Sequence, residues 1–160
     1  MIDEKRLIFI HGSDSSSQTY KAGLLRQQFP EMTVPDFSGS LAERMDQLEG
    51  ILGATTGWKI IGSSLGGTMA ALFAARHPDQ VRKLVLLAPA LELPEISEQV
   101  TGPIPVACTI FHGTQDEVVP LEENRRIAGR LFRELEYIVV EDDHRLHKTA
   151  EEMDWAKILE

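Results

Sequence analysis

The stretch Gly62-Ser63-Ser64-Leu65-Gly66 lies where an apolar segment, residues 58–62, gives way to a segment of small residues, 66–76. The first segment predicts a strand and the second a helix, so Ser64 falls on the sharp turn between them. The residues two before and two after that serine must lack side chains that would collide, and both are glycine. The pattern is typical of a nucleophile elbow, but it is short enough to occur by chance, so the rest of the chain must decide.

Apolar segments alternate with helix-like segments along the chain. Most of the apolar segments lack a polar alternation, which is typical of strands that are covered on both faces. They comprise residues 7–10, 32–37, 58–62, 84–88, 106–111 and 137–140. The alternation predicts an α/β fold with three layers: a doubly wound, mostly parallel sheet of six strands, with ligands bound at the carboxyl ends of the strands.

The helices are expected between these strands and after the last one. They comprise residues 19–29, 41–52, 66–76, 121–132 and 149–159. Ser40 and Glu43 have the spacing of a capping box at the start of the second helix. The connection from residue 88 to residue 106 leaves room for one helical turn at most.

Length and composition restrict the class of protein. The 160 residues are expected to form one domain, 1–160, and a formal charge of −9 without a basic cluster argues against nucleic acid and anionic membrane as partners. The longest apolar run, residues 84–91, is too short to span a bilayer. The charged start of the chain does not resemble a secretory signal, so a cytoplasmic protein is expected, with Cys108 as a buried small hydrophobe.

Polar residues follow four of the expected strands, at the edge where the carboxyl ends of parallel strands converge. They are His11-Gly12-Ser13-Asp14, then Ser64, then His112-Gly113-Thr114-Gln115-Asp116, and then Asp142-Asp143-His144. A serine, an acid and a histidine in that chain order are what nucleophilic acyl transfer requires. Ser64 is the candidate nucleophile, His144 the base and Asp116 the acid that orients it.

The oxyanion of a tetrahedral intermediate needs preorganised donors, and the backbone N–H groups of Leu65 and Ser13 are the candidates. Rivals to the other assignments remain open at this point. His147 competes with His144 as the base, and Asp142, Asp143 and Glu117 compete with Asp116 as the acid. His11 and His112 are interpreted as structural, and the loop around Ser64 could instead cradle a phosphate in a nucleotide- or flavin-binding fold.

These motifs together resemble the α/β-hydrolase superfamily, and in particular its small serine esterases. The resemblance rests on His11-Gly12, residues 62–67, residues 84–89, the stretch His112 to Pro120, and Asp143-His144. It implies that Asp116 is the triad acid. The chain is expected to depart from the family in two ways, since it begins at what is usually the third strand and has no lid domain after Ala88. The resemblance implies no metal and no cofactor, and a small-molecule ester as the substrate.

Without a lid, residues 91–105 are left to cover the site, so a shallow pocket is expected. Leu91, Leu93, Ile96 and Val118 are the expected substrate-binding side chains, with room for short acyl groups. The predicted function is therefore hydrolysis of short-acyl carboxylic esters through an acyl-enzyme on Ser64. A thioesterase with the same triad, and a binding protein that keeps the fold without catalysis, are the alternatives.

Overall fold

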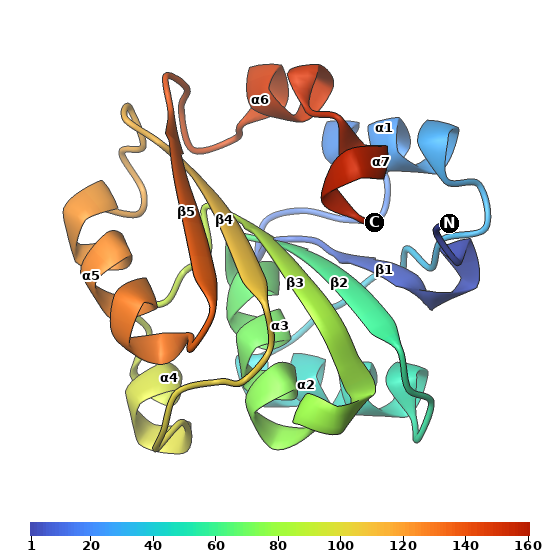
Figure 1. Ribbon diagram of the computed structural model, residues 1–160, viewed down its shortest axis with the longest axis horizontal. Coiled ribbons are helices and arrows are strands. Elements are labelled where there is room, and N and C mark those ends of the chain that lie inside the picture. The colour runs from blue at the N-terminus through green and yellow to red at the C-terminus, as the bar shows by residue number, and fades with distance from the viewer.

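The computed structural model describes all 160 residues and contains one five-stranded sheet, in which the strands lie in the order of the chain. Every neighbouring pair is parallel. The strands are β1 (Leu7–Ile10), β2 (Trp58–Ser63), β3 (Val81–Leu87), β4 (Cys108–Gly113) and β5 (Leu135–Val140). All carboxyl ends therefore meet at one edge of the sheet, as Figure 1 shows.

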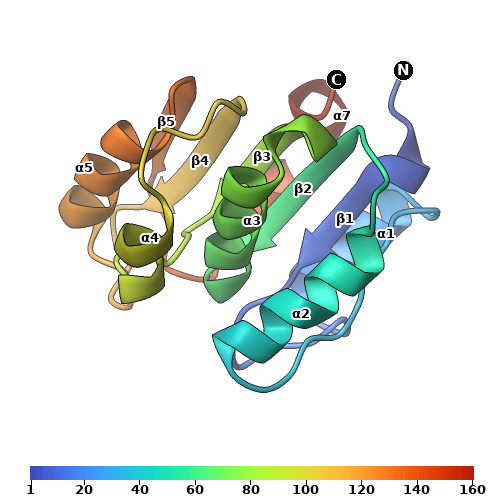
Figure 2. The ribbon, with the colours of Figure 1, turned by 90° about the horizontal axis from the view of Figure 1, so that it is seen from below.

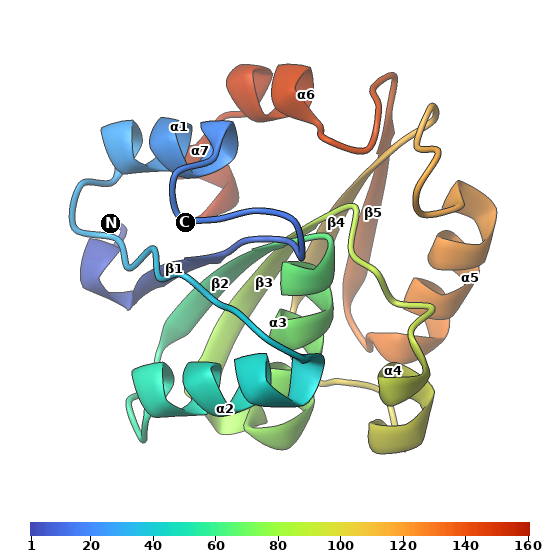
Figure 3. The same cartoon turned by 180° about the vertical axis from the view of Figure 1, so that it is seen from behind.

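Helices cover both faces of this sheet. They are α1 (Tyr20–Gln28), α2 (Leu41–Leu52), α3 (Leu65–Arg76), α4 (Pro94–Gln99), α5 (Leu121–Leu131), α6 (His147–Glu152) and α7 (Trp155–Ile158). Helices α2 to α5 lie on one face, and α1, α6 and α7 lie on the other (Figures 1 and 2). The view from behind shows α1 and α6 side by side above the sheet (Figure 3), so the last helices of the chain close the face that α1 begins to cover.

The strands divide their side chains between two cores. In β1, Ile8 and Ile10 belong to the larger core under α2 to α5, whereas Leu7 and Phe9 belong to the smaller core under α1, α6 and α7. Strand β3 alternates in the same way along residues 84–87. Because both faces are buried, the strands appear in the sequence as apolar runs, which confirms the three-layer α/β prediction.

The prediction of a sixth strand at residues 32–37 is wrong. This segment makes a single bridge, between Thr33 and Ile8, with a hydrogen bond from the Thr33 N–H to the Leu7 carbonyl at 2.9 Å. Pro35 follows two residues later and has no N–H to continue a ladder. Beyond it, the Phe37 N–H donates to His11 Nε2 at 2.9 Å and not to a neighbouring strand.

Two helical predictions also need correction. The expected helix over residues 149–159 is two short helices, because Asp154 leaves helical geometry and its carboxylate caps α7 through the Lys157 N–H. Helix α4 is six residues long, more than the single turn expected. The capping box of Ser40 and Glu43 is present at the start of α2. No helix of the structure combines the length and the apolar character needed to cross a bilayer.

Candidate active site

Ser64 occupies the turn between β2 and α3 with a φ of 55°, in the left-handed region that non-glycine residues rarely adopt. A Cβ on Gly62 would lie 2.5 Å from the Gly66 carbonyl oxygen, and a Cβ on Gly66 would lie 2.0 Å from the Ile10 carbonyl oxygen. Only glycine permits these approaches. A strained backbone of this kind costs about 1–3 kcal/mol, and the surrounding contacts hold it in place, including the Ser64 N–H bond to the Leu87 carbonyl at 3.0 Å.

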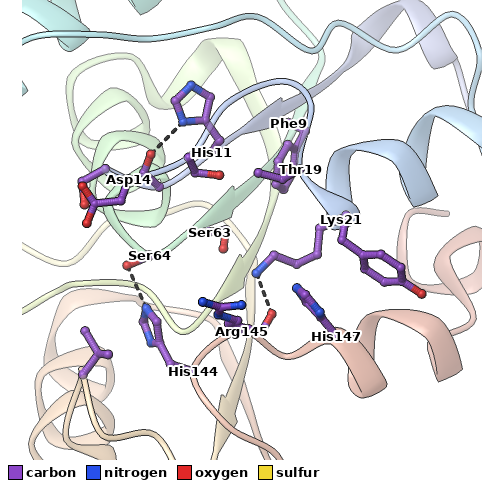
Figure 4. A pocket seen from close by; sticks show the side chains of 15 residues that line it. Phe9, His11, Asp14, Thr19, Lys21, Ser63, Ser64, His144, Arg145 and His147 are labelled. Carbon is purple, nitrogen blue, oxygen red and sulfur yellow. Dashed lines mark hydrogen bonds between the residues drawn. The ribbon is translucent and has the colours of Figure 1, made fainter.

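The structure brings Ser64, His144 and Asp116 together in one hydrogen-bonded chain. Ser64 Oγ lies 3.1 Å from His144 Nε2, and His144 Nδ1 lies 2.8 Å from Asp116 Oδ2. Figure 4 shows the first of these contacts. Ser64 follows β2, Asp116 lies in the turn after β4, and His144 lies in the loop after β5. The carboxyl ends of three strands of one parallel sheet therefore supply the three side chains.

The Asp116 side chain is fully buried. It stays ionised because its oxygens accept several hydrogen bonds. Burial raises its pKa, but hydrogen bonds from the Val119 N–H, from His144 and from the Val118 N–H together hold the pKa below its usual value. A carboxylate at this place accepts the Nδ1 proton of His144. The Nε2 lone pair then faces the serine hydroxyl, which is the arrangement a general base needs.

The ring of His112 lies against the candidate acid, Asp116. The ring is fully buried, its Nε2–H donates to the Val119 carbonyl at 2.9 Å, and the same nitrogen lies 3.3 Å from Asp116 Oδ2. Its ring also stacks on Tyr137. His112 therefore packs under the Asp116 turn and has no access to the cavity.

The rivals for the acid have other partners. Asp142 accepts from the N–H and the hydroxyl of Thr149, at 3.0 and 2.7 Å. Asp143 accepts from the Arg145 N–H at 3.0 Å. Both side chains form hydrogen bonds within the segment that carries His144, and neither bonds to the His144 ring.

The rival base, His147, is the first residue of α6, and its ring packs on Tyr20 with centroids 4.7 Å apart. It lines the same cavity as Ser64, but it makes no hydrogen bond with the serine hydroxyl. The geometry therefore places His144, and not His147, in reach of the candidate nucleophile.

The two candidate oxyanion donors flank Ser64. Leu65 is the first residue of α3, a position whose N–H has no partner within the helix. The chain at Gly12 passes against Ser64, since a Cβ on Gly12 would lie 3.4 Å from the serine Cβ. The Ser13 N–H makes no hydrogen bond within the protein. Both groups are thus free to donate to a ligand beside the serine hydroxyl.

Two side chains orient the loop that carries Ser13. His11 Nε2 accepts from the Phe37 N–H at 2.9 Å, so its Nδ1 carries the proton and donates to the Gly12 carbonyl at 2.7 Å. Arg44, a buried residue of α2, donates to the Ser13 carbonyl at 3.2 Å. The Gly12 C=O and the Ser13 N–H belong to one trans peptide and point in opposite directions, so the N–H points away from His11. Sequence reasoning missed Arg44, although its place among the apolar positions of residues 41–52 was a signal.

Ser64 opens into a cavity of about 550 Å³, and most of the residues that line it are polar or charged. Val118 and Phe9 contribute apolar surface, while Lys21, Arg145 and His147 contribute nitrogen-bearing side chains from α1 and from the segment after His144 (Figure 4). Sequence reasoning missed Lys21 and Arg145 as wall residues. The position of Arg145, directly after His144, was the available signal, whereas nothing in the sequence marked Lys21.

The structure does not bring Leu91, Leu93 and Ile96 to this cavity. They line a separate groove of about 440 Å³ together with residues of α5 such as Ile127. After β3 the chain passes to the face of the sheet that α2 to α5 cover, and there Leu91 and Ile96 are buried in the larger core. Of the four expected substrate-binding residues only Val118 lies at the cavity, with 65% of its surface exposed.

Comparison with known proteins agrees with this architecture. The family model described as alpha/beta hydrolase fold matches residues 9–105, which is more than half of the chain. The chain therefore belongs to the alpha/beta hydrolase family.

Among solved structures, the chain superposes on mouse alpha/beta hydrolase domain-containing protein 10 with a TM-score of 0.82, at 20% identity, over 99% of this chain and 89% of the other. It also superposes on an alpha-beta serine hydrolase homologue from Coxiella burnetii with a TM-score of 0.75, at 16% identity, over 99% and 85%. At such identities the likeness shows the fold alone.

Among curated proteins, homoserine O-acetyltransferase from Thermus thermophilus is 40% identical over 62 residues. That segment is 39% of this chain but only 15% of the acetyltransferase, so the chain matches a small part of that enzyme's length.

Proposed function

We propose that the protein is a serine hydrolase that cleaves small carboxylic esters through an acyl-enzyme on Ser64. The observation that carries the proposal is the continuous chain of contacts from Ser64 Oγ to His144, at 3.1 Å, and from His144 to Asp116, at 2.8 Å. A serine hydroxyl is a weak nucleophile at neutral pH and needs a base within this reach.

In the acylation step, His144 Nε2 takes the Ser64 hydroxyl proton as the serine oxygen bonds to the ester carbonyl carbon. The carbonyl π electrons move onto the oxygen, which becomes the oxyanion between the N–H groups of Leu65 and Ser13. Collapse of this intermediate breaks the bond to the alcohol oxygen, and the proton on His144 passes to the departing alcohol. The negative Asp116 carboxylate stabilises the imidazolium in between.

In the deacylation step, water takes the place of the alcohol. His144 removes a proton from the water as its oxygen attacks the acyl carbon, and the same oxyanion donors receive the second intermediate. Collapse returns the proton to Ser64 and releases the carboxylic acid. His11 and Arg44 contribute to both steps only by holding the loop that presents the Ser13 N–H.

Thioesters pass through the same intermediates, so a thioesterase is the alternative within this mechanism. The partial match to homoserine O-acetyltransferase, whose name describes transfer of an acetyl group to an oxygen, supports acyl chemistry for this chain. For the present chain, water is the proposed acyl acceptor.

The test is labelling with a fluorophosphonate, combined with turnover of phenyl acetate and of its thioester analogue. We expect one label per chain on Ser64, no label on the Ser64→Ala variant, and loss of phenyl acetate turnover after labelling. A wild-type protein that neither takes the label nor hydrolyses either substrate would instead be a binding protein with a hydrolase fold.

A further inference from the structure

The wall of the catalytic cavity differs in charge from the rest of the molecule. The chain carries a formal charge of −9, yet the cavity is lined by Lys21, Arg145 and His147 and by one acid, Asp14. In Figure 4, Asp14 lies on one side of Ser64, and Lys21, Arg145 and His147 gather on the other. An acidic protein thus places two cations, Lys21 and Arg145, together beside the candidate nucleophile.

Lys21 is the more enclosed of these two cations. Its side chain extends from α1 into the cavity, and Nζ donates to the Arg145 carbonyl at 2.6 Å (Figure 4). No carboxylate lies within ion-pair distance of Nζ, so two of its three N–H groups have no protein acceptor. A partly buried ammonium without a counter-ion is unfavourable in the empty cavity, and an anionic ligand would relieve this.

Arg145 adds a second cation to the wall of the cavity. Its guanidinium makes no ion pair and lines the cavity next to Lys21. The hydroxyls of Ser15 and Thr19 also line this cavity and can donate to an anion. An ammonium, a planar guanidinium and hydroxyl donors form a donor set that suits a carboxylate.

We propose that Lys21 and Arg145 form a carboxylate-binding subsite, so that the esters cleaved at Ser64 carry a free carboxylate in addition to the scissile ester bond. This inference rests on the proposed function and names the substrate class of the same site.

The test compares matched pairs of esters on the wild-type protein. On the acyl side, phenyl hydrogen adipate is paired with phenyl hexanoate, in which a methyl group replaces the carboxylate. On the alcohol side, 4-acetoxybenzoate is paired with 4-methylphenyl acetate. Each kcat/KM is divided by the rate of alkaline hydrolysis of the same ester, which removes differences in intrinsic reactivity. We expect the carboxylated ester to be preferred at least tenfold in one pair, and that pair identifies the side that carries the carboxylate.

Lys21 also fastens the loop that carries His144, because its ammonium group donates to the Arg145 carbonyl. Loss of this bond lowers the turnover of both members of a pair, whereas loss of the subsite lowers only that of the carboxylated ester. For Lys21→Met we therefore expect the preference within the pair to fall at least fivefold, on top of any loss that both members share, after correction for the fraction of folded protein. Arg145→Gln, which keeps the backbone carbonyl, should lower the preference at least twofold. Lys148→Met removes an exposed lysine that does not line the cavity and is the matched control.

The pH dependence of the preference gives a further readout. Burial, with a smaller contribution from Arg145, outweighs the attraction of Asp143 and Asp142 and lowers the pKa of Lys21 to about 8. The other titratable neighbours are His147 and Tyr20, with Glu151 bonded to Tyr20. The free enzyme therefore carries the Lys21 cation below pH 8 and loses it above, so the preference should fall between pH 7 and pH 9, with Arg145 retaining part of it.

The outcomes separate the two proposals. If Ser64 is labelled and both members of each pair are cleaved at corrected rates within twofold, the carboxylate subsite is excluded while the hydrolase proposal stands. Equal losses on both members of a pair in Lys21→Met, together with no change of preference in Arg145→Gln, would show a fastening role alone and exclude the subsite. Absence of both labelling and turnover would overturn the two proposals together.

Discussion

The cavity at Ser64 and the groove beside α4 and α5 are lined by different kinds of side chain. The cavity at Ser64 is walled by hydroxyls, cations and backbone from β1, α1 and the loop after β5. The groove beside α4 and α5 is walled largely by Leu91, Leu93, Ile96 and their apolar neighbours. Position in the sequence suggested the opposite, because residues 91–105 directly follow a strand whose end lies beside the nucleophile.

The difference shows that apolar residues near the candidate nucleophile are buried in the hydrophobic core and do not line the cavity. The segment after β3 is apolar, so burying it on the α2 to α5 face stabilises the fold by about 25 cal/mol for each Å² removed from water. The polar and charged segments after β1 and β5 have no such preference for the core, and they remain at the sheet edge to line the site. The following experiments test whether activity depends on the cavity while the groove contributes only to stability.

The largest effect is expected for Ser64→Ala, which removes the proposed nucleophile. The variant should lose about 10⁴-fold or more in kcat on phenyl acetate while its thermal unfolding changes little, because the hydroxyl takes part in bond formation and not in core packing. Ser97→Ala, in the groove, is the matched control and should keep wild-type turnover. Retention of activity within tenfold by Ser64→Ala would remove the assignment.

His144→Ala should follow with a loss of about 10³-fold or more, since no other ring lies within hydrogen-bond reach of Ser64. His147→Ala changes the cavity wall beside Tyr20 and should cost a few-fold at most on a neutral ester. The measurement is steady-state kcat on phenyl acetate for both variants. A larger loss in His147→Ala than in His144→Ala would transfer the role of base to His147.

The pH profile is expected to reveal a single essential ionisation on its acid side. An imidazole must be neutral to accept the serine proton, and imidazole groups ordinarily take up a proton near pH 6.5. The pKa of Asp116 is held low, so this carboxylate keeps its charge as the pH falls. The kcat/KM for phenyl acetate should thus fall tenfold per pH unit on the acid side of the profile. A profile that is flat to pH 4 would contradict a histidine base.

A smaller effect is expected along a series of neutral acyl chains from acetate to palmitate. Each fully buried methylene contributes about 0.8 kcal/mol, but few of the residues that line the cavity are hydrophobic, Phe9 and Val118 among them. We expect kcat/KM to change only a few-fold from two to six carbons and to decline beyond, with no jump when the substrate forms an emulsion. A maximum at long chains would show that apolar surface from outside the cavity closes over the substrate.

The smallest effect on activity is expected for Ile96→Ala, although its effect on stability is large. Truncation of this buried side chain should lower the free energy of unfolding by about 2–4 kcal/mol. The kcat/KM at 25 °C should stay within twofold of wild type, because the groove does not reach Ser64. Urea unfolding and turnover of phenyl acetate measure the two quantities, and a tenfold loss of kcat/KM in folded protein would connect the groove to the cavity.

The sequence allowed the fold to be predicted where local patterns and packing agree. Apolar runs located all five strands, and the spacing of Gly62 and Gly66 located the turn at Ser64. The segment around Pro35 also reads as a strand, but an apolar run does not reveal whether its N–H groups find a neighbour. The split between α6 and α7 likewise depends on the capping of one turn by Asp154.

The residues beside the nucleophile could be expected from the order of strand ends, because a parallel sheet brings those ends to one edge. The residues that line the cavity walls could not be expected from the sequence, since they depend on which face of the sheet each connection crosses. Lys21 reaches the site only because α1 lies next to α6, a pairing of segments far apart in the chain. Arg44 reaches the Ser13 loop in the same way, from a helix on the opposite face.

The glycines around the site affect which of its residues can be replaced by mutation. A Cβ on Gly66 would lie 2.0 Å from the Ile10 carbonyl oxygen, and a Cβ on Gly113 would lie 2.2 Å from the Asp142 carbonyl oxygen. The main chain that follows Ser64 therefore packs directly on the end of β1, and the main chain that precedes Asp116 packs directly on the loop of His144. The side chains of Lys21, Arg145 and His147 take no part in these contacts. Mutation can consequently replace these wall residues and alter which molecule the cavity accepts, while Ser64, Asp116 and His144 keep their spacing.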